Sequence, residues 1–140
     1  MNTPLRVRDH MATDLVTITP DTEIMRAVGL LVEHDISGMP VVDEGGNIVG
    51  ILTERDCIAT AVQAGYFDEG GGSVREFMSS PVETADVDDS LMDIADRLSK
   101  SEYRRFPVLE DGRLVGLISR RDVMQVLKQV SWFKPSAEDD

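Results

Sequence analysis

The sequence contains very little cysteine and no long apolar run. Cys57 is the single cysteine among 140 residues, so no internal disulfide can form, and a reducing cytoplasm is the expected location. No apolar stretch approaches the ~20 residues of a membrane-spanning helix. The segment MNTPLRVRDHM (1–11) has no apolar stretch after its charged residues, so we expect no secretory signal. A cytoplasmic protein without a membrane partner is predicted.

Basic residues are also scarce. There are 14 Lys and Arg against 26 Asp and Glu, a formal net charge of −12. This balance argues against nucleic-acid binding, which needs a basic surface to neutralise phosphates. Residues 1–72 contain 4 basic and 12 acidic residues, whereas residues 73–140 contain 10 and 14. A local basic cluster on an acidic chain suits a small anion better than a polymer.

Recognisable catalytic and metal-binding patterns are missing. Neither G-x-x-x-x-G-K-[ST] nor G-x-G-x-x-G occurs. His10 and His34 lack the spacing of a zinc site, and residues 86–97 lack the Gly and the Glu that a calcium loop requires. Cys57 is interpreted as a small buried thiol. No activated nucleophile or acid–base pair has a recognisable spacing, so we predict a protein that is not an enzyme and needs no metal.

The sequence does contain one phrase written twice. GILTERD (50–56) and GLISRRD (116–122) each read as Gly, two apolar residues, Thr or Ser, two polar residues and Asp. Two further pairs of segments match at nearly the same offset: VRDHM (7–11) with VREFM (74–78), and MPVVDEGGNIVG (39–50) with FPVLEDGRLVG (106–116). A repeat of this length indicates duplication of one supersecondary unit.

Each copy predicts an extended segment, a helix, a strand, a glycine turn, a strand and a final helix. Helical spacing of apolar residues indicates one buried face in each first helix: Ile24, Ala27, Val28 and Leu31, and Leu91, Ile94, Ala95 and Leu98. DEGGN and EDG predict hairpins, and the final helices are expected at about 54–64 and 120–130. Most methionines, such as Met25, Met92 and Met124, fall at inferred core positions, so a methionine-rich binding surface is not expected.

The predicted fold class is α+β, with two β-α-β-β-α repeats packed with pseudo-two-fold symmetry, because two such units can cover each other's sheets. The expected boundaries are 5–64 for the first repeat, 65–73 for a glycine-rich linker, 74–131 for the second repeat and 132–140 for a flexible acidic tail.

The residue types of the duplicated phrase suit a helix start that binds phosphate. Thr53 and Ser119 stand where a helix begins and where a hydroxyl can cap free N–H groups. A strand that runs into a helix N-terminus beside a glycine is also a place where phosphates bind. Asp56 and Asp122 fit either a ligand contact or a simpler role, as first-turn acids stabilised by the helix dipole.

With the V-R-x-x-M segments, ISGMPVVD (36–43) and the repeated phrase in place, the chain resembles a tandem pair of cystathionine β-synthase domains, often called a Bateman module. The resemblance covers about residues 5–131 and implies no separate catalytic domain. It implies that Asp56 and Asp122 accept hydrogen bonds from the ribose hydroxyls of an adenine nucleotide. Thr53 and Ser119 would then meet the phosphate together with backbone N–H groups.

The resemblance also implies two composite pockets. The first would combine Thr53 and Asp56 with Val82, Thr84, Arg104, Arg105 and Pro107; the second would combine Ser119, Arg120, Arg121 and Asp122 with Val16, Ile18, Ile36, Ser37, Gly38 and Pro40. Arg104 and Arg105 stand where the second pocket has Ser37 and Gly38. Since arginine suits phosphate, the Asp56 pocket is expected to prefer the more highly phosphorylated nucleotide. Arg120 and Arg121 would partly compensate in the other. The alternative role for the arginines is ion pairing with acidic neighbours.

The function implied is a non-catalytic sensor of AMP, ADP or ATP, in which the ligand tightens the packing of the two repeats. A homodimer through the apolar helix faces and a regulated protein partner are expected, and no cofactor is required. Two alternatives stay open: a constitutive dimeric scaffold with vestigial pockets, and a binder of another adenosyl ligand such as S-adenosylmethionine.

Overall fold

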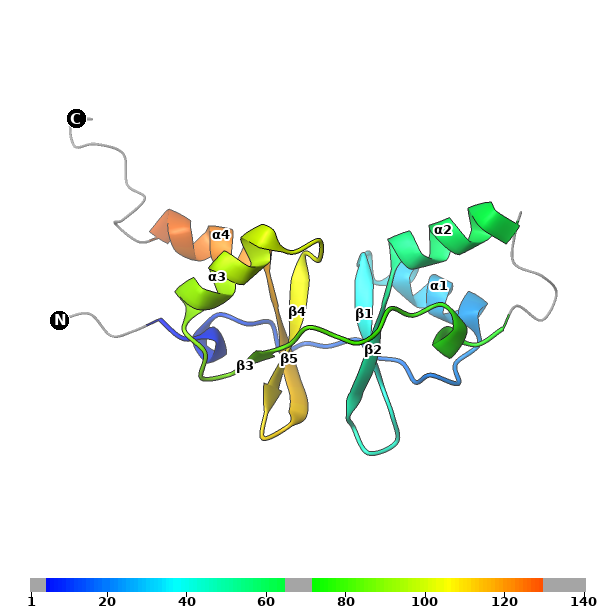
Figure 1. Ribbon diagram of the computed structural model, residues 1–140, viewed down its shortest axis with the longest axis horizontal. Coiled ribbons are helices and arrows are strands. Elements are labelled where there is room, and N and C mark those ends of the chain that lie inside the picture. Colours follow the sequence, from blue (N-terminus) through cyan, green and yellow to red (C-terminus); the bar gives the residue numbers. More distant parts are fainter. Residues whose placement is uncertain (1–4, 65–71, 130–140) are drawn as a thin grey trace. The chain divides into compact units, whose positions relative to one another are not determined.

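The computed structural model describes residues 5–64 and 72–129. Figure 1 shows its elements, which follow in chain order: η1 (Val7–Asp9), α1 (Ile24–Glu33), β1 (Gly38–Val42), β2 (Ile48–Thr53), α2 (Glu54–Ala64), η2 (Val74–Glu76), β3 (Ala85–Asp86), α3 (Leu91–Lys100), β4 (Arg105–Glu110), β5 (Arg113–Ser119) and α4 (Arg120–Gln129). The order helix, strand, strand, helix occurs twice, as predicted, and the α+β class is confirmed.

The chain forms two compact units that do not follow chain order. Among the described residues, unit 1 consists mainly of residues 5–14 with residues 83–129, and unit 2 mainly of residues 15–64 with residues 72–82. Each sequence repeat therefore gives its opening segment to the unit built by the other repeat. The linker predicted at 65–73 lies almost entirely outside the described residues, and the tail predicted at 132–140 lies wholly outside them.

Unit 2 is built on an antiparallel pair of strands. β1 and β2 pair with Gly38 opposite Thr53 and Met39 opposite Leu52, and the segment before α1 adds a parallel bridge between Ile18 and Val41. The predicted helix stripe packs onto this pair, which confirms the periodicity argument. The buried core residues are Ile18, Ile24, Ala27, Leu31, Met39, Val41, Leu52, Cys57 and Val74.

The segment around η2 completes unit 2. Val74 is fully buried in its core, and the Val74 N–H donates to the Thr22 carbonyl at 2.8 Å. Arg75 pairs with Asp21 at 2.8 Å, and Ser79 forms an antiparallel bridge with Ile51 of β2. The opening segment of the second repeat is thus tied to the first repeat by a core side chain and by main-chain bonds.

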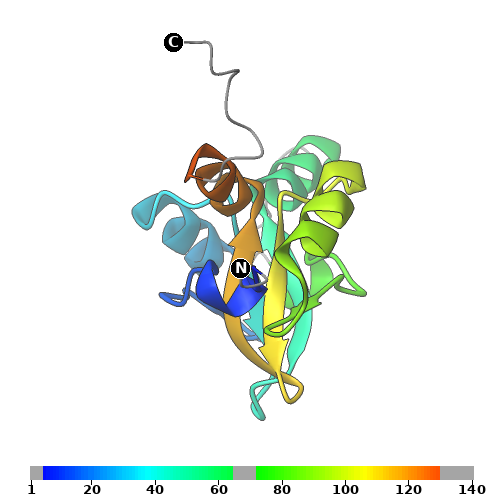
Figure 2. The ribbon, with the colours of Figure 1, turned by 90° about the vertical axis from the view of Figure 1, so that its left-hand side faces the viewer.

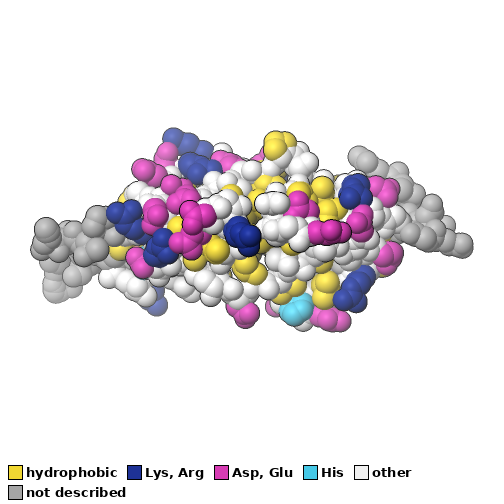
Figure 3. Space-filling model, turned by 90° about the horizontal axis from the view of Figure 1, so that it is seen from below, with side chains coloured by type: hydrophobic (Ala, Val, Ile, Leu, Met, Phe, Trp, Pro, Cys, Tyr) yellow, Lys and Arg dark blue, Asp and Glu magenta, His cyan; other side chains and the backbone are white. Residues whose placement is uncertain are grey.

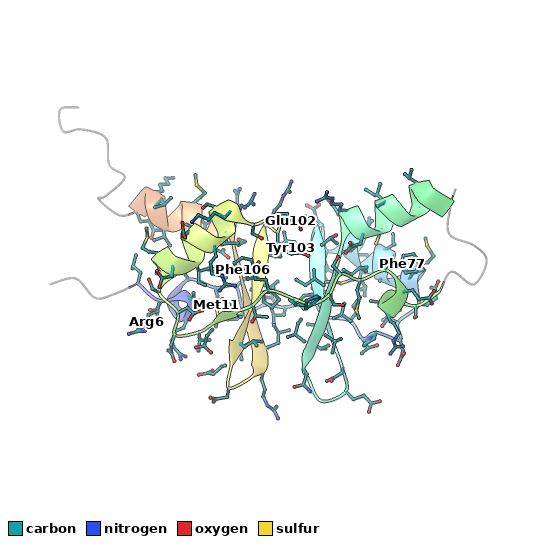
Figure 4. The ribbon with its side chains drawn as sticks, in the orientation of Figure 1. Arg6, Met11, Phe77, Glu102, Tyr103 and Phe106 are labelled. Atoms are coloured by element: carbon teal, nitrogen blue, oxygen red, sulfur yellow. The ribbon has the colours of Figure 1, made fainter. Side chains whose placement is uncertain are left out.

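Unit 1 contains a three-stranded sheet in the order β3-β4-β5. β3 pairs in parallel with β4, with Ala85 opposite Val108. Asp111 (φ 53°) and Gly112 (φ 82°) connect β4 to β5, and two positive φ values in a two-residue loop are typical of the type I′ hairpin turn. The buried core residues are Val7, Ala85, Val87, Leu91, Ile94, Leu98, Phe106, Val108, Ile118, Val123 and Val126. Figure 4 labels Phe106 among them.

The segment around η1 has the equivalent place in unit 1. Figure 2 shows this blue segment in front of the orange strand β5. Val7 is fully buried, Arg8 pairs with Asp88 at 3.0 Å, and Ala12 bridges Leu117 of β5. The two exchanged segments therefore make equivalent contacts in their units: a buried valine, an arginine–aspartate ion pair and a main-chain bridge to the second strand of the hairpin.

These exchanged segments explain the glycine in each copy of the repeated phrase. A Cβ atom on Gly50 would lie 2.5 Å from Met78 Sδ, and one on Gly116 would lie 2.7 Å from Met11 Sδ and 2.8 Å from the Ala12 carbonyl oxygen. Real Cβ atoms do not approach other atoms so closely. Glycine is retained because the exchanged segment crosses directly over the strand at this position.

The prediction that Met25, Met92 and Met124 lie in the core is wrong. Their side chains are 49%, 47% and 59% exposed. Each one directly follows a buried residue of its helix, and successive residues of a helix lie about 100° apart around the axis. The methionines consequently face away from the core.

Candidate functional site

Thr53 and Asp56 cap the N-terminus of α2. The Asp56 N–H donates to Thr53 Oγ1 at 3.0 Å, and the Thr53 N–H donates to Asp56 Oδ2 at 3.0 Å. This reciprocal pair is a capping box, which satisfies two backbone donors at a helix start. Strand β2 delivers Thr53 to this position because it ends where α2 begins.

The N-terminus of α4 has the same arrangement. The Asp122 N–H donates to Ser119 Oγ at 3.1 Å, and the Ser119 N–H donates to Asp122 Oδ2 at 2.9 Å. We call residues 53–56 and 119–122 the two helix entrances. In both, the hydroxyl caps the helix as predicted, and the aspartate has a folding role that requires no ligand.

The two carboxylates differ in their second oxygen. Asp56 Oδ1 accepts a hydrogen bond from the Ser79 hydroxyl at 2.9 Å. Ser79 belongs to the exchanged segment of unit 2, and its counterpart in unit 1 is Ala12, since both residues bridge the same position of β2 or β5. Within residues 5–64 and 72–129, no hydrogen bond reaches Asp122 Oδ1. The repeat conceals this difference because Ser79 lies 23 residues from Asp56.

The loop before the first strand of each pair lies against the helix entrance of its own unit. The Glu54 N–H donates to the Ser37 carbonyl at 2.9 Å, and the Arg120 N–H donates to the Arg104 carbonyl at 2.9 Å. Ser37 therefore shares a unit with Asp56, and Arg104 shares one with Asp122.

The remaining predicted site residues divide between the units as follows. Unit 2 contains Val16, Ile18, Ile36, Ser37, Gly38, Pro40, Thr53, Asp56 and Val82, and unit 1 contains Thr84, Arg104, Arg105, Pro107, Ser119, Arg120, Arg121 and Asp122. Both composite pockets implied by the resemblance combine residues from the two units, so that pairing stays a prediction.

The predicted phosphate-binding arginines have different surroundings. Arg120 donates from Nε to the Leu98 carbonyl at 3.1 Å and from Nη2 to the Ser101 carbonyl at 2.6 Å. Its guanidinium therefore satisfies carbonyls at the C-terminus of α3, where a cation is favoured. Arg104 and Arg121 are exposed, and Arg105 is half-buried. None of these contacts tests whether the four arginines bind phosphate, so that role stays a prediction.

Arg97 is a residue that the sequence analysis missed. It donates to the Thr84 carbonyl at 2.9 Å and to Glu83 Oε2 at 3.1 Å, and its guanidinium carbon lies 4.8 Å from the centroid of the Phe106 ring. Arg97 thus fixes the backbone of Thr84, a residue predicted to line the first pocket, against the core. Nothing in the local pattern of α3 indicated this contact.

Cys57 lies one residue beyond Asp56 and is buried in the core of unit 2. Burial, with the nearby charge of Asp56, raises the pKa of the Cys57 thiol to about 11. The interpretation of Cys57 as a small buried thiol is therefore confirmed, and a neutral thiol in this place is a poor nucleophile.

The surface carries charges of both signs. On the face in Figure 3, acidic and basic side chains are interspersed. The basic side chains of the described residues form no continuous patch on this face. No group of three or more His, Cys, Asp or Glu in residues 5–64 and 72–129 is placed to hold a metal ion. None of the helices that the structure describes is long and apolar enough to span a membrane.

Comparison with known proteins places this geometry in a family. The family model described as CBS domain matches residues 7–62 and 74–129. The CBS domain-containing protein YhcV of Bacillus subtilis is 30% identical over 117 residues, which are 84% of this chain and 81% of the relative. The next three curated relatives are longer, and this chain spans between 24% and 61% of their length.

Two solved structures resemble the chain closely. CBSX2 of Arabidopsis thaliana in complex with AMP is 28% identical, with a TM-score of 0.78 over 89% of this chain and 96% of that one. The CBS domain pair of protein MJ0100, in complex with 5′-methylthioadenosine and S-adenosyl-L-methionine, is 30% identical, with a TM-score of 0.77 over 91% and 98% of the two chains.

Proposed function

This chain belongs to the CBS domain family, and from that premise we propose that it is a non-catalytic regulatory module that binds an adenine nucleotide. One observation carries the proposal. The two capping boxes present an aspartate and a hydroxyl at duplicated helix starts, in a fold whose relatives include a pair in complex with AMP. A cytoplasmic location, with access to the nucleotide pool, belongs to the same proposal.

The proposed grip has two parts. The carboxylates of Asp56 and Asp122 accept hydrogen bonds from the vicinal hydroxyls of ribose, since a carboxylate has about four acceptor sites and the capping box occupies one. The positive dipole end of each helix then favours a phosphate at this position. Thr53 and Ser119 complete this part with their hydroxyls.

Phosphate number is the proposed basis of discrimination between nucleotides. The resemblance pairs Arg104 and Arg105 with the ribose acceptor Asp56, and we retain that pairing as a proposal. Arginine binds phosphate through charge-assisted and often bidentate hydrogen bonds. Changing both arginines to alanine is expected to weaken ATP more than adenosine, and equal losses for the two ligands would contradict this role.

The signal is proposed to pass through a homodimer. Large apolar side chains are exposed on all four helices of the described chain: Met25, Val32, Ile58, Val62, Met92 and Met124. A second copy of the chain would bury them in an isologous contact. A ligand that binds one arrangement of such an assembly more tightly shifts its population, and a regulated protein partner reads that shift.

Two alternative functions follow from particular observations. The complex of a relative with S-adenosyl-L-methionine favours an adenosyl ligand without phosphates, and the exposed apolar side chains favour a constitutive dimeric scaffold. Mass spectrometry of the small molecules that co-purify with the protein separates the ligand classes. Thermal melts with AMP, ADP, ATP and S-adenosylmethionine test the scaffold, because no shift with any of the four would favour it over a sensor.

A further inference from the structure

We propose that the two helix entrances are unequal ribose acceptors. Asp122 is the stronger site, and Asp56 is the weaker one because the Ser79 hydroxyl competes with ribose for its carboxylate. This inference rests on the proposed function, because it concerns the same two carboxylates. It names Ser79 as a specificity-determining residue and assigns the order in which the entrances fill.

The two carboxylates differ in how many of their acceptor sites the described chain occupies. Asp122 accepts one hydrogen bond from the described chain, at Oδ2 from Ser119, so both lone pairs of Oδ1 remain open. Asp56 accepts from Thr53 at Oδ2 and from Ser79 at Oδ1. A vicinal diol donates two hydrogen bonds. At Asp122 both can go to the open oxygen Oδ1. At Asp56 each oxygen already accepts a hydrogen bond, so the diol must divide its two bonds between Oδ1 and Oδ2 or displace Ser79 from Oδ1.

Displacement has a cost because Ser79 is half-buried. A hydroxyl that donates to a carboxylate forms a charge-assisted bond, and removing its acceptor leaves a polar group that must find another partner. A ribose that displaces Ser79 therefore exchanges one good hydrogen bond for another at Asp56, and a ribose that divides its bonds shares both oxygens with the donors already there. At Asp122 it adds hydrogen bonds to an open oxygen. With a net contribution of about 0.5–1.5 kcal/mol per bond, Asp122 should bind AMP roughly three- to tenfold more tightly.

The repeat provides a reciprocal test, since Ala12 has the same position in unit 1 that Ser79 has in unit 2. Ala12 exchanges main-chain bonds with Leu117 at 2.8 and 2.9 Å, and Ser79 exchanges them with Ile51 at 2.9 and 3.1 Å. A serine at position 12 would therefore extend its hydroxyl toward Asp122 as Ser79 does toward Asp56. Ser79→Ala should raise the affinity of the Asp56 entrance, and Ala12→Ser should lower that of the Asp122 entrance.

The experiment measures AMP affinity by calorimetry, one entrance at a time. The Asp122→Asn variant reports on Asp56, and the Asp56→Asn variant reports on Asp122. Ser79→Ala is added to each background, and Ala12→Ser to the Asp56→Asn background. We expect Ser79→Ala to tighten AMP roughly three- to tenfold in the Asp122→Asn protein and to leave the Asp56→Asn protein unchanged. Ala12→Ser should weaken AMP by a similar factor.

Two results would overturn the inference. Unchanged or weaker AMP binding on adding Ser79→Ala to the Asp122→Asn protein would mean that Ser79 orients the carboxylate rather than competing for it. That result leaves the proposed function intact. Failure of the unsubstituted protein to bind AMP, ADP or ATP would overturn both. Stepwise titration of the unsubstituted protein and of Ser79→Ala alone gives a second measurement if the asparagine variants unfold, because Ser79→Ala should bring the two binding steps closer together.

Discussion

Replacing Gly116 with alanine tests how the exchanged segment packs in unit 1. The added Cβ would lie 2.8 Å from the Ala12 carbonyl oxygen and 2.7 Å from Met11 Sδ. The sulfur belongs to a flexible side chain and can move, but the carbonyl is fixed, since it accepts a hydrogen bond from the Leu117 N–H at 2.9 Å. Relief of the clash must therefore displace the backbone bridge that attaches the N-terminal segment to β5.

The expected magnitude combines two opposing effects. Alanine in place of glycine inside a strand gains about 0.5–1 kcal/mol in backbone entropy, while overpacking costs about 1–3 kcal/mol. The net loss at Gly116 should be about 1–2 kcal/mol. At Gly50 the nearest atom is Met78 Sδ and the nearest carbonyl oxygen lies 3.1 Å away, so the loss there should be smaller.

Urea unfolding followed by circular dichroism measures these changes, and a double-mutant cycle assigns them. Met78→Ala should remove most of the cost of Gly50→Ala, because it removes the atom in conflict. Met11→Ala should rescue Gly116→Ala only in part, because the Ala12 carbonyl stays. Full stability of Gly116→Ala, or full rescue by Met11→Ala, would refute the packing of the N-terminal segment over β5.

Three further predictions concern stability and assembly. Phe106→Ala should cost about 3–5 kcal/mol of unfolding free energy, because it empties the core of unit 1, whereas Met124→Ala at an exposed position should change it by less than about 0.5 kcal/mol; equal losses in urea titrations would contradict the burial pattern. The raised pKa of Cys57 favours the neutral thiol in the folded state, so its contribution to stability is complete below the unfolded thiol pKa and is lost as the pH rises toward about 11. Cys57→Ala should therefore flatten the decline of stability between pH 8 and pH 11, and an unchanged slope would count against the shift. Ile58→Asp with Val62→Asp should convert a dimer to a monomer in light scattering, and an unaltered mass would exclude this face of α2 from the contact.

Local pattern was sufficient for the elements of the fold. The apolar stripes of α1 and α3 follow from helical spacing, and three of the four predicted residues in each are buried: Ile24, Ala27 and Leu31, and Leu91, Ile94 and Leu98. The hairpin at Asp111 and Gly112 follows from turn chemistry, and the capping hydroxyls of Thr53 and Ser119 follow from their position before a helix. Each of these features depends only on residues that are close together in the sequence.

Contacts between distant residues could not be read from local spacing. Arg8 and Asp88 are 80 residues apart, and their pairing depends on the exchange of opening segments between the repeats. Because the two V-R-x-x-M segments are alike in sequence, nothing in them indicates which repeat each one completes. The bond between Ser79 and Asp56 was missed for the same reason, although the difference between Ser79 and Ala12 is visible once the repeats are aligned.

The exposed methionines show a different limit. Met25 and Met92 each follow a buried residue of their helix, and hydrophobicity alone does not distinguish a core residue from its neighbour on an outward face. The same ambiguity applies to Arg120, whose charge suggested an anion ligand but whose guanidinium donates to carbonyls at the end of α3.

Calorimetric titration of AMP into two variants tests whether Asp56 and Asp122 accept hydrogen bonds from the ribose of an adenine nucleotide. The variant with both Asp56→Asn and Asp122→Asn keeps the side-chain size and removes both proposed ribose acceptors. Its control, Asp93→Asn, changes an acid in the first turn of α3 that has no proposed ligand role. We expect AMP to bind the control as it binds the unsubstituted protein, and the double variant to lose at least about tenfold in affinity. Equal AMP binding by the two variants, with both folded, would contradict it.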